Sequence, residues 1–204
     1  MKSSNKMIHN FLIEQSKRFP LINNEIEKNG VLKIKKQNLD LFSFIAKTII
    51  SQQISDQIAQ LLWKRLCAQL NTKIISIESF KNINYLKNIL TKTKISQPKI
   101  NYISDVYIAF TRNEIMDYTL YNKNDDEIIS LLLNFRGIGP WTCNMLLIFY
   151  YEKLNIFPEN DLIIKKTRDK LNILEKKKIN FRKTFSPFLS IFSLHLWKMS
   201  KRIL

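Results

Sequence analysis

The chain has 204 residues, 45% of them hydrophobic, which is enough to bury the core of one domain or of two small lobes. Its 33 Lys and Arg outnumber 17 Asp and Glu, and this net charge of +16 favours a polyanionic partner; the overuse of Lys, Ile and Asn fits a genome-wide compositional bias about equally well. Two cysteines are too few for a disulfide scaffold or for a four-cysteine zinc or iron–sulfur site, and the three glycines, at positions 30, 137 and 139, do not have the spacing of a complete Gly-x-Gly-x-x-Gly nucleotide loop.

The N-terminal residues contain no apolar segment of the kind found in secretion signals. No stretch approaches the roughly 18 consecutive apolar residues of a membrane span. The sequence therefore predicts a soluble intracellular protein, in the cytoplasm or nucleoid or in a eukaryotic nucleus, with no membrane partner.

The spacing of apolar residues predicts an all-α fold. Residues 1–29 are predicted to be helical, and residues 31–36 to form a short strand or an extended linker. A helix begins at Asp40 and is interrupted by the polar segment 51–55, whose last residue, Ser55, can cap the next helix. Four apolar residues are expected to form the buried stripe of that helix, namely Ile58, Leu61, Leu62 and Leu66.

Shorter helices are predicted across residues 71–120. Asn124 and Glu127 then have the spacing of a capping box, which predicts the start of a helix there. A helix near the end of the chain is expected to start at Ser186-Pro187, with the serine as its cap and the proline as its first residue.

Two glycines flank one aliphatic residue between two predicted helices, at Gly137-Ile138-Gly139. This pattern permits a tight turn anchored in the core by Ile138, and the absence of a side chain at Gly139 lets a DNA backbone come close. The helix that follows, with Pro140 at its first position, offers unpaired N–H groups to a phosphate. The segment is thus predicted to be a helix-hairpin-helix that holds duplex DNA without reading its sequence; a purely structural turn between two helices is the alternative.

Asp161 follows Pro158 at the expected start of another helix, where N–H groups and the helix dipole stabilise a carboxylate. The simplest explanation of such an aspartate is an ordinary N-cap. Glu159 and Asn160 compete with it for that position.

The segments Gly-Ile-Gly-Pro-Trp-Thr-Cys-Asn (137–144) and Phe-Pro-Glu-Asn-Asp-Leu (157–162) resemble the helix-hairpin-helix and Gly/Pro…Asp motif (HhH-GPD) of base-excision DNA glycosylases. Three features are similar to the 3-methyladenine DNA glycosylase II branch: the segment Ser-Gln-Gln-Ile-Ser (51–55), Trp141 where the lyases carry a lysine, and the C-terminal segment from Pro187 to Trp197. The resemblance runs from about residue 40 to the end of the chain.

This resemblance implies a fold of two helical lobes with the active-site cleft between them. It makes Asp161 the catalytic aspartate of a monofunctional glycosylase that hydrolyses the N-glycosidic bond of alkylated purines in duplex DNA. Gln53 matches the residue that wedges into the gap left by the flipped base. The base pocket would be formed by Trp141, Met145 and Trp197, and the hairpin residues on the DNA backbone would be Gly137, Ile138, Gly139, Trp141 and Thr142.

The resemblance also implies that no cofactor is required, that there is no iron–sulfur cluster, and that a structural Na⁺ or K⁺ can sit at the hairpin on the carbonyls of Leu133, Phe135 and Ile138. The chain is expected to act on DNA with a damaged base as a monomer. Departures from the family pattern, which leave the base preference open, are Phe188 for Trp, Leu189 for Arg and Met145 for an aromatic residue.

Three parts of the chain are expected. Residues 1–35 form an N-terminal helical segment on the C-terminal lobe, residues 36–140 a central lobe ending in the hairpin (about 125–150), and residues 141–204 a basic C-terminal lobe with Asp161. The alternatives are a non-catalytic helix-hairpin-helix DNA-binding module and a glycosylase for an oxidised or deaminated base. His195 is expected to be a satisfied core histidine, and Cys67 and Cys143 buried thiols.

Overall fold

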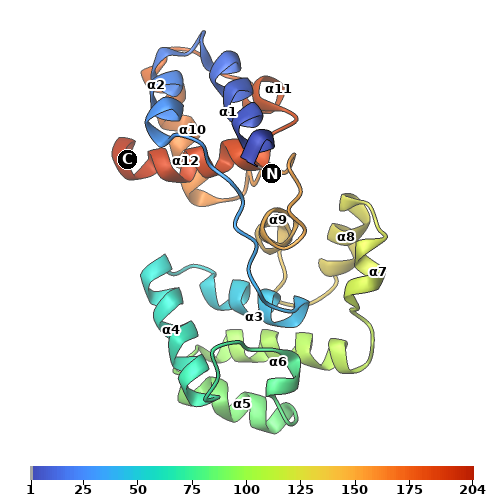
Figure 1. Ribbon diagram of the computed structural model, residues 1–204. Helices are drawn as coiled ribbons and strands as arrows, with labels where there is room; N and C mark the ends of the chain where they lie inside the picture. Colours follow the sequence, from blue (N-terminus) through green and yellow to red (C-terminus); the bar gives the residue numbers. More distant parts are fainter. Residues whose placement is uncertain (1) are drawn as a thin grey trace. The chain divides into compact units, whose positions relative to one another are not determined.

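The computed structural model describes residues 2–204, and over this range the chain forms helices and no strand, which confirms the all-α prediction (Figure 1). Residues 31–36 are extended without pairing into a sheet. The helices are α1 (Lys2–Ser16), α2 (Pro20–Asn29), α3 (Leu41–Ser51), α4 (Asp56–Gln69), η1 (Ile77–Ser79, a 3₁₀ turn), α5 (Ile83–Lys92), α6 (Gln97–Thr111), α7 (Asp117–Tyr121), α8 (Asp125–Leu132), α9 (Pro140–Phe149), α10 (Leu162–Leu174), α11 (Phe181–Phe185) and α12 (Leu189–Ile203).

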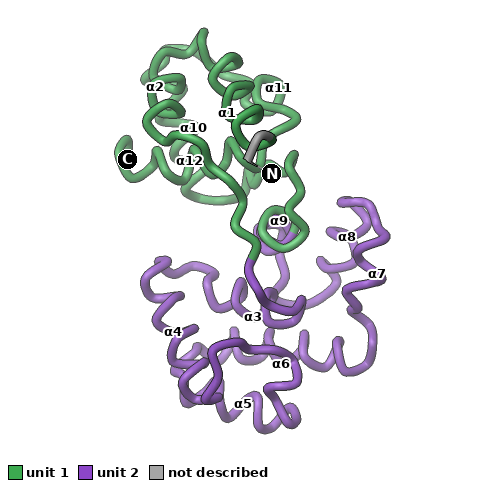
Figure 2. Tube along the Cα trace, viewed as in Figure 1, with its two compact units in different colours: residues 1–36, 147–204 green, residues 37–146 purple. Residues whose placement is uncertain are grey.

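The chain divides into two compact units, shown in Figure 2, and the first contains residues 1–36 and 147–204. Its core joins the two ends of the sequence, because Ile22 and Ile26 of α2 are buried in one cluster with residues of α10 and α12. The rings of Phe185 and Phe192 stack at a centroid distance of 3.7 Å within that cluster. The predicted domain boundaries follow residues 35 and 140, whereas the structure divides the chain after residues 36 and 146, the latter inside α9.

The second unit contains residues 37–146 and is built around α3. Asp40 caps this helix with one carboxylate oxygen, which accepts the N–H of Ser43 at 2.7 Å, and its other oxygen accepts the N–H of Ile77 at 2.8 Å. Behind this cap Phe42 makes edge-to-face contacts with the rings of Phe80 and Tyr107. The polar start of α3 thus fixes the helix over an aromatic core.

The predicted buried stripe of α4 is wrong in two of its four positions. Ile58 and Leu61 are 50% and 47% exposed, while Ala59 and Leu66 are buried. Residues seven apart lie on the same face of a helix, so a face centred on Ala59 and Leu66 turns Ile58 and Leu61 away from the core. Ser55 does cap α4, with Oγ accepting the N–H of Ile58 at 3.4 Å.

The predicted start of the last helix is also wrong. Ser186 ends α11 as its C-cap, with its N–H donating to the carbonyl of Arg182, and α12 begins at Leu189 after Phe188. The short preceding helix therefore uses the serine that the sequence suggested as an N-cap. None of the helices in residues 2–204 combines the length and apolarity that crossing a membrane requires.

Candidate DNA-binding and catalytic site

Helices α8 and α9 form the hairpin that the two glycines predicted. The capping box is confirmed: Asn124 Oδ1 accepts the N–H of Glu127 at 3.0 Å, and Glu127 Oε2 accepts the N–H of Asn124 at 2.8 Å. Ile138 is 5% exposed, so the turn is anchored in the core as expected. Pro140 is the first residue of α9.

The two glycines of the hairpin are needed for different reasons. Gly137 has a φ of +87°, and a Cβ there would lie 2.3 Å from Cγ of Tyr102, so the fold itself excludes a side chain. A Cβ on Gly139 would meet nothing within 4 Å. The packing of the protein thus places no demand on Gly139, which leaves room for an external molecule beside the turn.

The Ser51–Ser55 turn is held against the hairpin by Gln52. Its Nε2 donates to the carbonyl oxygen of Gly137 at 2.9 Å and to Oγ1 of Thr142 at 3.0 Å. From the other side, Lys99 Nζ donates to the carbonyl oxygens of Ile50 and Gln52, both at 2.7 Å, and burial lowers the pKa of this amine. Nothing in the sequence marks Lys99, because a lysine 47 residues further along the chain than Gln52 is indistinguishable from the other surface lysines.

Gln53 follows directly and is exposed. Its φ of 57° lies in the left-handed region, which is unfavourable for a residue with a side chain. Strained residues of this kind occur at functional sites when their surroundings hold them in place. Here the hydrogen bonds of Gln52 and Lys99 hold the turn, so the backbone from which the Gln53 side chain extends is fixed.

Asp161 is the N-cap of α10. Its Oδ1 accepts the N–H of Ile164 at 2.9 Å, while the Asp161 N–H donates to the carbonyl of Pro158 at 2.9 Å. Among the candidates for this cap Asp161 has taken the position, and Glu159 instead pairs with Arg182 at 2.9 Å. The Asp161 side chain is 9% exposed, so a carboxylate is held in a largely water-free setting by the N-terminus of a helix.

Trp197 of α12 lies beside this carboxylate. Its Nε1–H donates to Asp161 Oδ1 at 3.1 Å, and its ring is 5.9 Å from that of Phe149. The sequence placed Trp197 in the base pocket but missed the hydrogen bond, since nothing in the spacing of two residues 36 positions apart predicts it. The structure thus brings Asp161 and Trp197 together in the first unit.

The other predicted site residues lie in the second unit, which ends at Leu146. Trp141 is half-buried on the first turn of α9, and Met145 is 7% exposed. Thr142 is buried and accepts the bond from Gln52. Gln53, the hairpin, Trp141 and Met145 therefore share one unit.

His195 is only partly satisfied, contrary to expectation. It is fully buried, and its Nδ1 lies 3.1 Å from Asn29 Nδ2, but Nε2 has no hydrogen-bond partner among residues 2–204. Burial lowers the pKa of His195 to about 3. Cys67 is half-buried rather than buried, and burial raises the pKa of Cys143 to about 11, which makes its thiol a poor nucleophile at neutral pH.

Three curated relatives are similar to most of this chain, although no family model matches it. The DNA-3-methyladenine glycosylase of Saccharomyces cerevisiae is 29% identical over 199 residues, covering 79% of this chain and 67% of the relative. DNA-3-methyladenine glycosylase 1 of Schizosaccharomyces pombe is 24% identical over 169 residues, covering 77% of this chain and 71% of the relative. A Bacillus subtilis relative, 25% identical over 169 residues, is longer, and the chain spans 58% of its length.

Solved structures share the fold. The 3-methyladenine DNA glycosylase of Schizosaccharomyces pombe with abasic DNA has a TM-score of 0.76 at 20% identity, covering 96% of this chain and 97% of the other. The 3-methyladenine DNA-glycosylase of Archaeoglobus fulgidus has a TM-score of 0.77 at 20% identity, covering 97% and 70%. The 8-oxoguanine glycosylase/lyase of Clostridium acetobutylicum with double-stranded DNA has 0.70 at 17% identity, covering 95% and 70%, so this fold alone does not specify the base.

Proposed function

We propose that this chain, which belongs to the helix-hairpin-helix (HhH-GPD) family of DNA glycosylases in its 3-methyladenine branch, removes alkylated purines from duplex DNA by hydrolysis of the N-glycosidic bond. The observation that carries the proposal is the Asp161 carboxylate, which is 9% exposed, caps α10 and accepts a hydrogen bond from Trp197 at 3.1 Å. A module that only binds DNA has no use for such a carboxylate, because it repels phosphate.

The hairpin is proposed to hold the DNA backbone. The N–H groups at the start of α9 offer bonds to a phosphate, and the open space beside Gly139 admits the strand. The net charge of +16 gives the long-range attraction. The carbonyls of Leu133, Phe135 and Ile138 are proposed to hold a Na⁺ or K⁺; Phe135 accepts the N–H of Ile138 at 3.1 Å, and a carbonyl oxygen has a second lone pair for a cation.

The target base has to leave the stack before its glycosidic bond can be reached. Gln53, exposed on its fixed turn, is proposed to fill the gap. The base pocket is proposed to include Trp141, Met145 and Trp197, with the indole of Trp141 attracting a cationic purine. An alkylated purine carries positive charge, so it suits such a pocket better than a neutral oxidised base does.

In the reaction the C1′–N bond breaks with its electron pair passing to the base, and positive charge develops on the sugar. The Asp161 carboxylate stabilises this charge and orients a water molecule, whose oxygen bonds to C1′ as its proton is accepted by the carboxylate. A cationic purine leaves as a neutral base, so little acid catalysis is needed. The chemistry requires no metal or organic cofactor, and one monomer can process one flipped base.

The test is base release from methylated duplex DNA by the wild type and Asp161→Asn. Asparagine can still cap α10, so the fold should persist while release falls at least about a hundredfold. Free 3-methyladenine or 7-methylguanine, with abasic strands left intact, is the expected product of the wild type. Equal release by Asp161→Asn would overturn the catalytic role and point to Glu159; no release with salt-sensitive DNA binding retained would favour the binding-module alternative or another lesion.

A further inference from the structure

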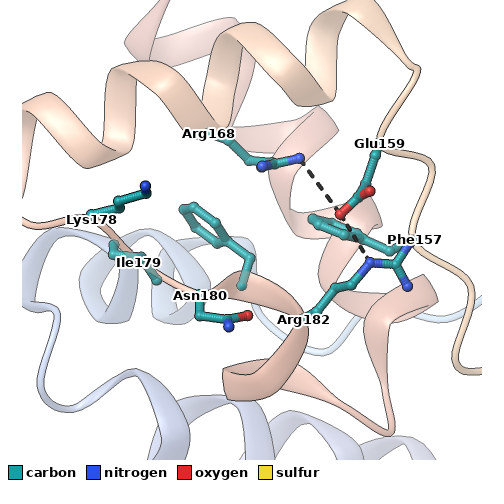
Figure 3. A pocket seen from close by; sticks show the side chains of 8 residues that line it. Phe157, Glu159, Arg168, Lys178, Ile179, Asn180 and Arg182 are labelled. Atoms are coloured by element: carbon teal, nitrogen blue, oxygen red, sulfur yellow. Dashed lines mark hydrogen bonds and ion pairs between the residues drawn. The ribbon is translucent and has the colours of Figure 1, made fainter.

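The first unit contains an open cavity of about 370 Å³ for which the proposed reaction has no use. It lies between the middle of α10, the segment before α10 and the start of α11. Its lining residues include Glu159, Arg168, Lys178, Asn180 and Arg182 together with two phenylalanines (Figure 3). All of these residues belong to residues 147–204.

The charge on the cavity wall is positive. Arg168, Lys178 and Arg182 are opposed by Glu159 alone. Figure 3 shows Glu159 between the two arginines: its Oε1 is 2.9 Å from Nε of Arg182 and 4.0 Å from Nη1 of Arg168. One carboxylate cannot neutralise three cations, so the cavity favours an anion.

Arg168 packs against two aromatic rings, and one of its nitrogen atoms has no hydrogen-bond partner among residues 2–204. Its guanidinium lies 5.4 Å from the centroid of the Phe157 ring and 5.6 Å from that of Phe181. Its Nε is buried and has no hydrogen-bond partner among residues 2–204. Because Nε is closed to solvent, a ligand in the open cavity meets the exposed part of the guanidinium instead, and the Arg168 side chain is 28% exposed.

The aromatic rings indicate what kind of anion fits. Phe157 and Phe181 are 4% and 2% exposed, so neither offers a face on which a nucleobase could stack. The donors that remain are the Arg168 guanidinium, the Lys178 amine and the amide NH₂ of Asn180, whose Oδ1 accepts the N–H of Lys183 at 3.0 Å. A planar guanidinium beside an amine suits the several oxygens of a phosphate group.

We propose that this cavity is a phosphate-binding subsite, with Arg168, Lys178 and Asn180 as donors, and that its occupant is a backbone phosphate of the bound DNA. This proposal depends on the proposed function, because the binding of DNA is part of that function. Arg168 lies seven residues beyond Asp161 on α10, or about 10 Å at the rise of an α-helix, and a strand rises about 3.4 Å per nucleotide. The cavity therefore lies within a few nucleotide lengths of the proposed catalytic carboxylate.

The experiment measures the Kd for an undamaged duplex at several salt concentrations, so that the result does not depend on base release. Arg168→Gln should weaken binding about tenfold and reduce the slope of log K against log salt by about 0.9. The matched control is Lys170→Gln, on the same helix and exposed but outside the cavity, which should leave the slope unchanged.

Because Arg168 packs on two rings, Arg168→Gln could fail to fold. Lys178→Gln is the second variant: Lys178 is exposed and makes no hydrogen bond or ion pair within residues 2–204, so its loss leaves the packing intact. It should weaken DNA binding with the same change in slope. In parallel, the Nε–H resonance of Arg168 is followed by NMR while inorganic phosphate is added.

Weaker DNA binding and a smaller slope in either cavity variant, with the control unchanged, would support the proposal. Unchanged DNA binding with a shift of the Arg168 resonance would assign the subsite to free phosphate and overturn the DNA assignment. Unchanged DNA binding without such a shift would overturn the subsite altogether. If the wild type released no base yet the cavity variants bound DNA more weakly, the proposed reaction would fail and the subsite would stand.

Discussion

The indole N–H of Trp197 donates to Oδ1 of Asp161 at 3.1 Å, and the same oxygen accepts the backbone N–H of Ile164 at 2.9 Å. Two donors from different helices therefore fix one oxygen of the carboxylate. Because a carboxylate is planar and rigid, fixing one oxygen also restricts the position of the other. Trp197 is in this way a positioning residue for Asp161 as well as part of the proposed base pocket.

Trp197→Phe tests this role, because phenylalanine keeps an aromatic ring against Phe149 and removes only the N–H donor and some volume. Without the Trp197 donor the carboxylate is held less firmly, and we expect the single-turnover rate of base release to fall about tenfold. The Kd for undamaged DNA should stay the same. Trp63→Phe in the second unit is the matched control, and an unchanged rate in Trp197→Phe would contradict the positioning role.

The two hairpin glycines give a prediction with opposite outcomes. Gly137→Ala combines a φ of +87° with a Cβ 2.3 Å from the Tyr102 ring, so the free energy of unfolding should fall by about 2–3 kcal/mol or more. Gly139→Ala adds a Cβ in open space and should change that free energy by less than about 0.5 kcal/mol. Denaturant unfolding of both variants measures the difference.

Only Gly139→Ala should weaken DNA binding at unchanged stability, because its methyl group occupies the space proposed for the strand. We expect about a tenfold higher Kd, measured by fluorescence anisotropy. If Gly139→Ala bound DNA as tightly as the wild type, the backbone would not approach at this turn.

Local chemistry made much of this fold predictable. The capping box at Asn124, the cap at Asp161 and the burial of Ile138 each depend on residues within a few positions of one another, and each is found in the structure. The site relations that the sequence missed are long-range. The bond from Trp197 to Asp161 and the bond from Lys99 to Gln52 depend on how helices pack, which no local pattern encodes.

The two wrong predictions, the buried stripe of α4 and the start of α12, also depend on how helices pack. Helix α4 has more apolar residues than fit on the side that faces the core. Their spacing therefore predicted a wider buried stripe than the packing uses, and Ile58 and Leu61 are exposed. At Ser186 the local pattern fits a cap equally well at the end of α11 and at the start of α12. In the structure Ser186 is the C-cap of α11, so only the first of these positions is used.

Gln53→Gly separates stability from function at the proposed wedge. Glycine adopts a φ of 57° without the cost that a side chain brings there, so the variant should be more stable by about 0.5–1 kcal/mol. The single-turnover rate should nevertheless fall tenfold or more, since nothing fills the gap left by the flipped base. Lys94→Gly, also exposed and with a φ of 64°, is the control: it should gain stability and keep its rate.

The buried His195 makes stability depend on pH. Burial, with His9 and Lys198 nearby, lowers the pKa of His195 from 6.5 to about 3, and the pKa of His9 is lowered by burial too. Between about pH 6.5 and 3 the unfolded chain therefore binds a proton that the folded chain does not, and stability falls as the pH falls, by about 1.4 kcal/mol per pH unit for His195.

Between pH 6.5 and pH 5 this single group should lower the free energy of unfolding by about 2 kcal/mol, measured by urea denaturation. Glu25, whose pKa is lowered by Arg202 and Lys28 against the effect of burial, changes stability in the same direction at lower pH. His195→Gln should therefore show a shallower loss from pH 6.5 to pH 5, whatever its stability at pH 7, because glutamine does not titrate. Equal slopes in the variant and the wild type would show that folding does not lower the pKa of His195.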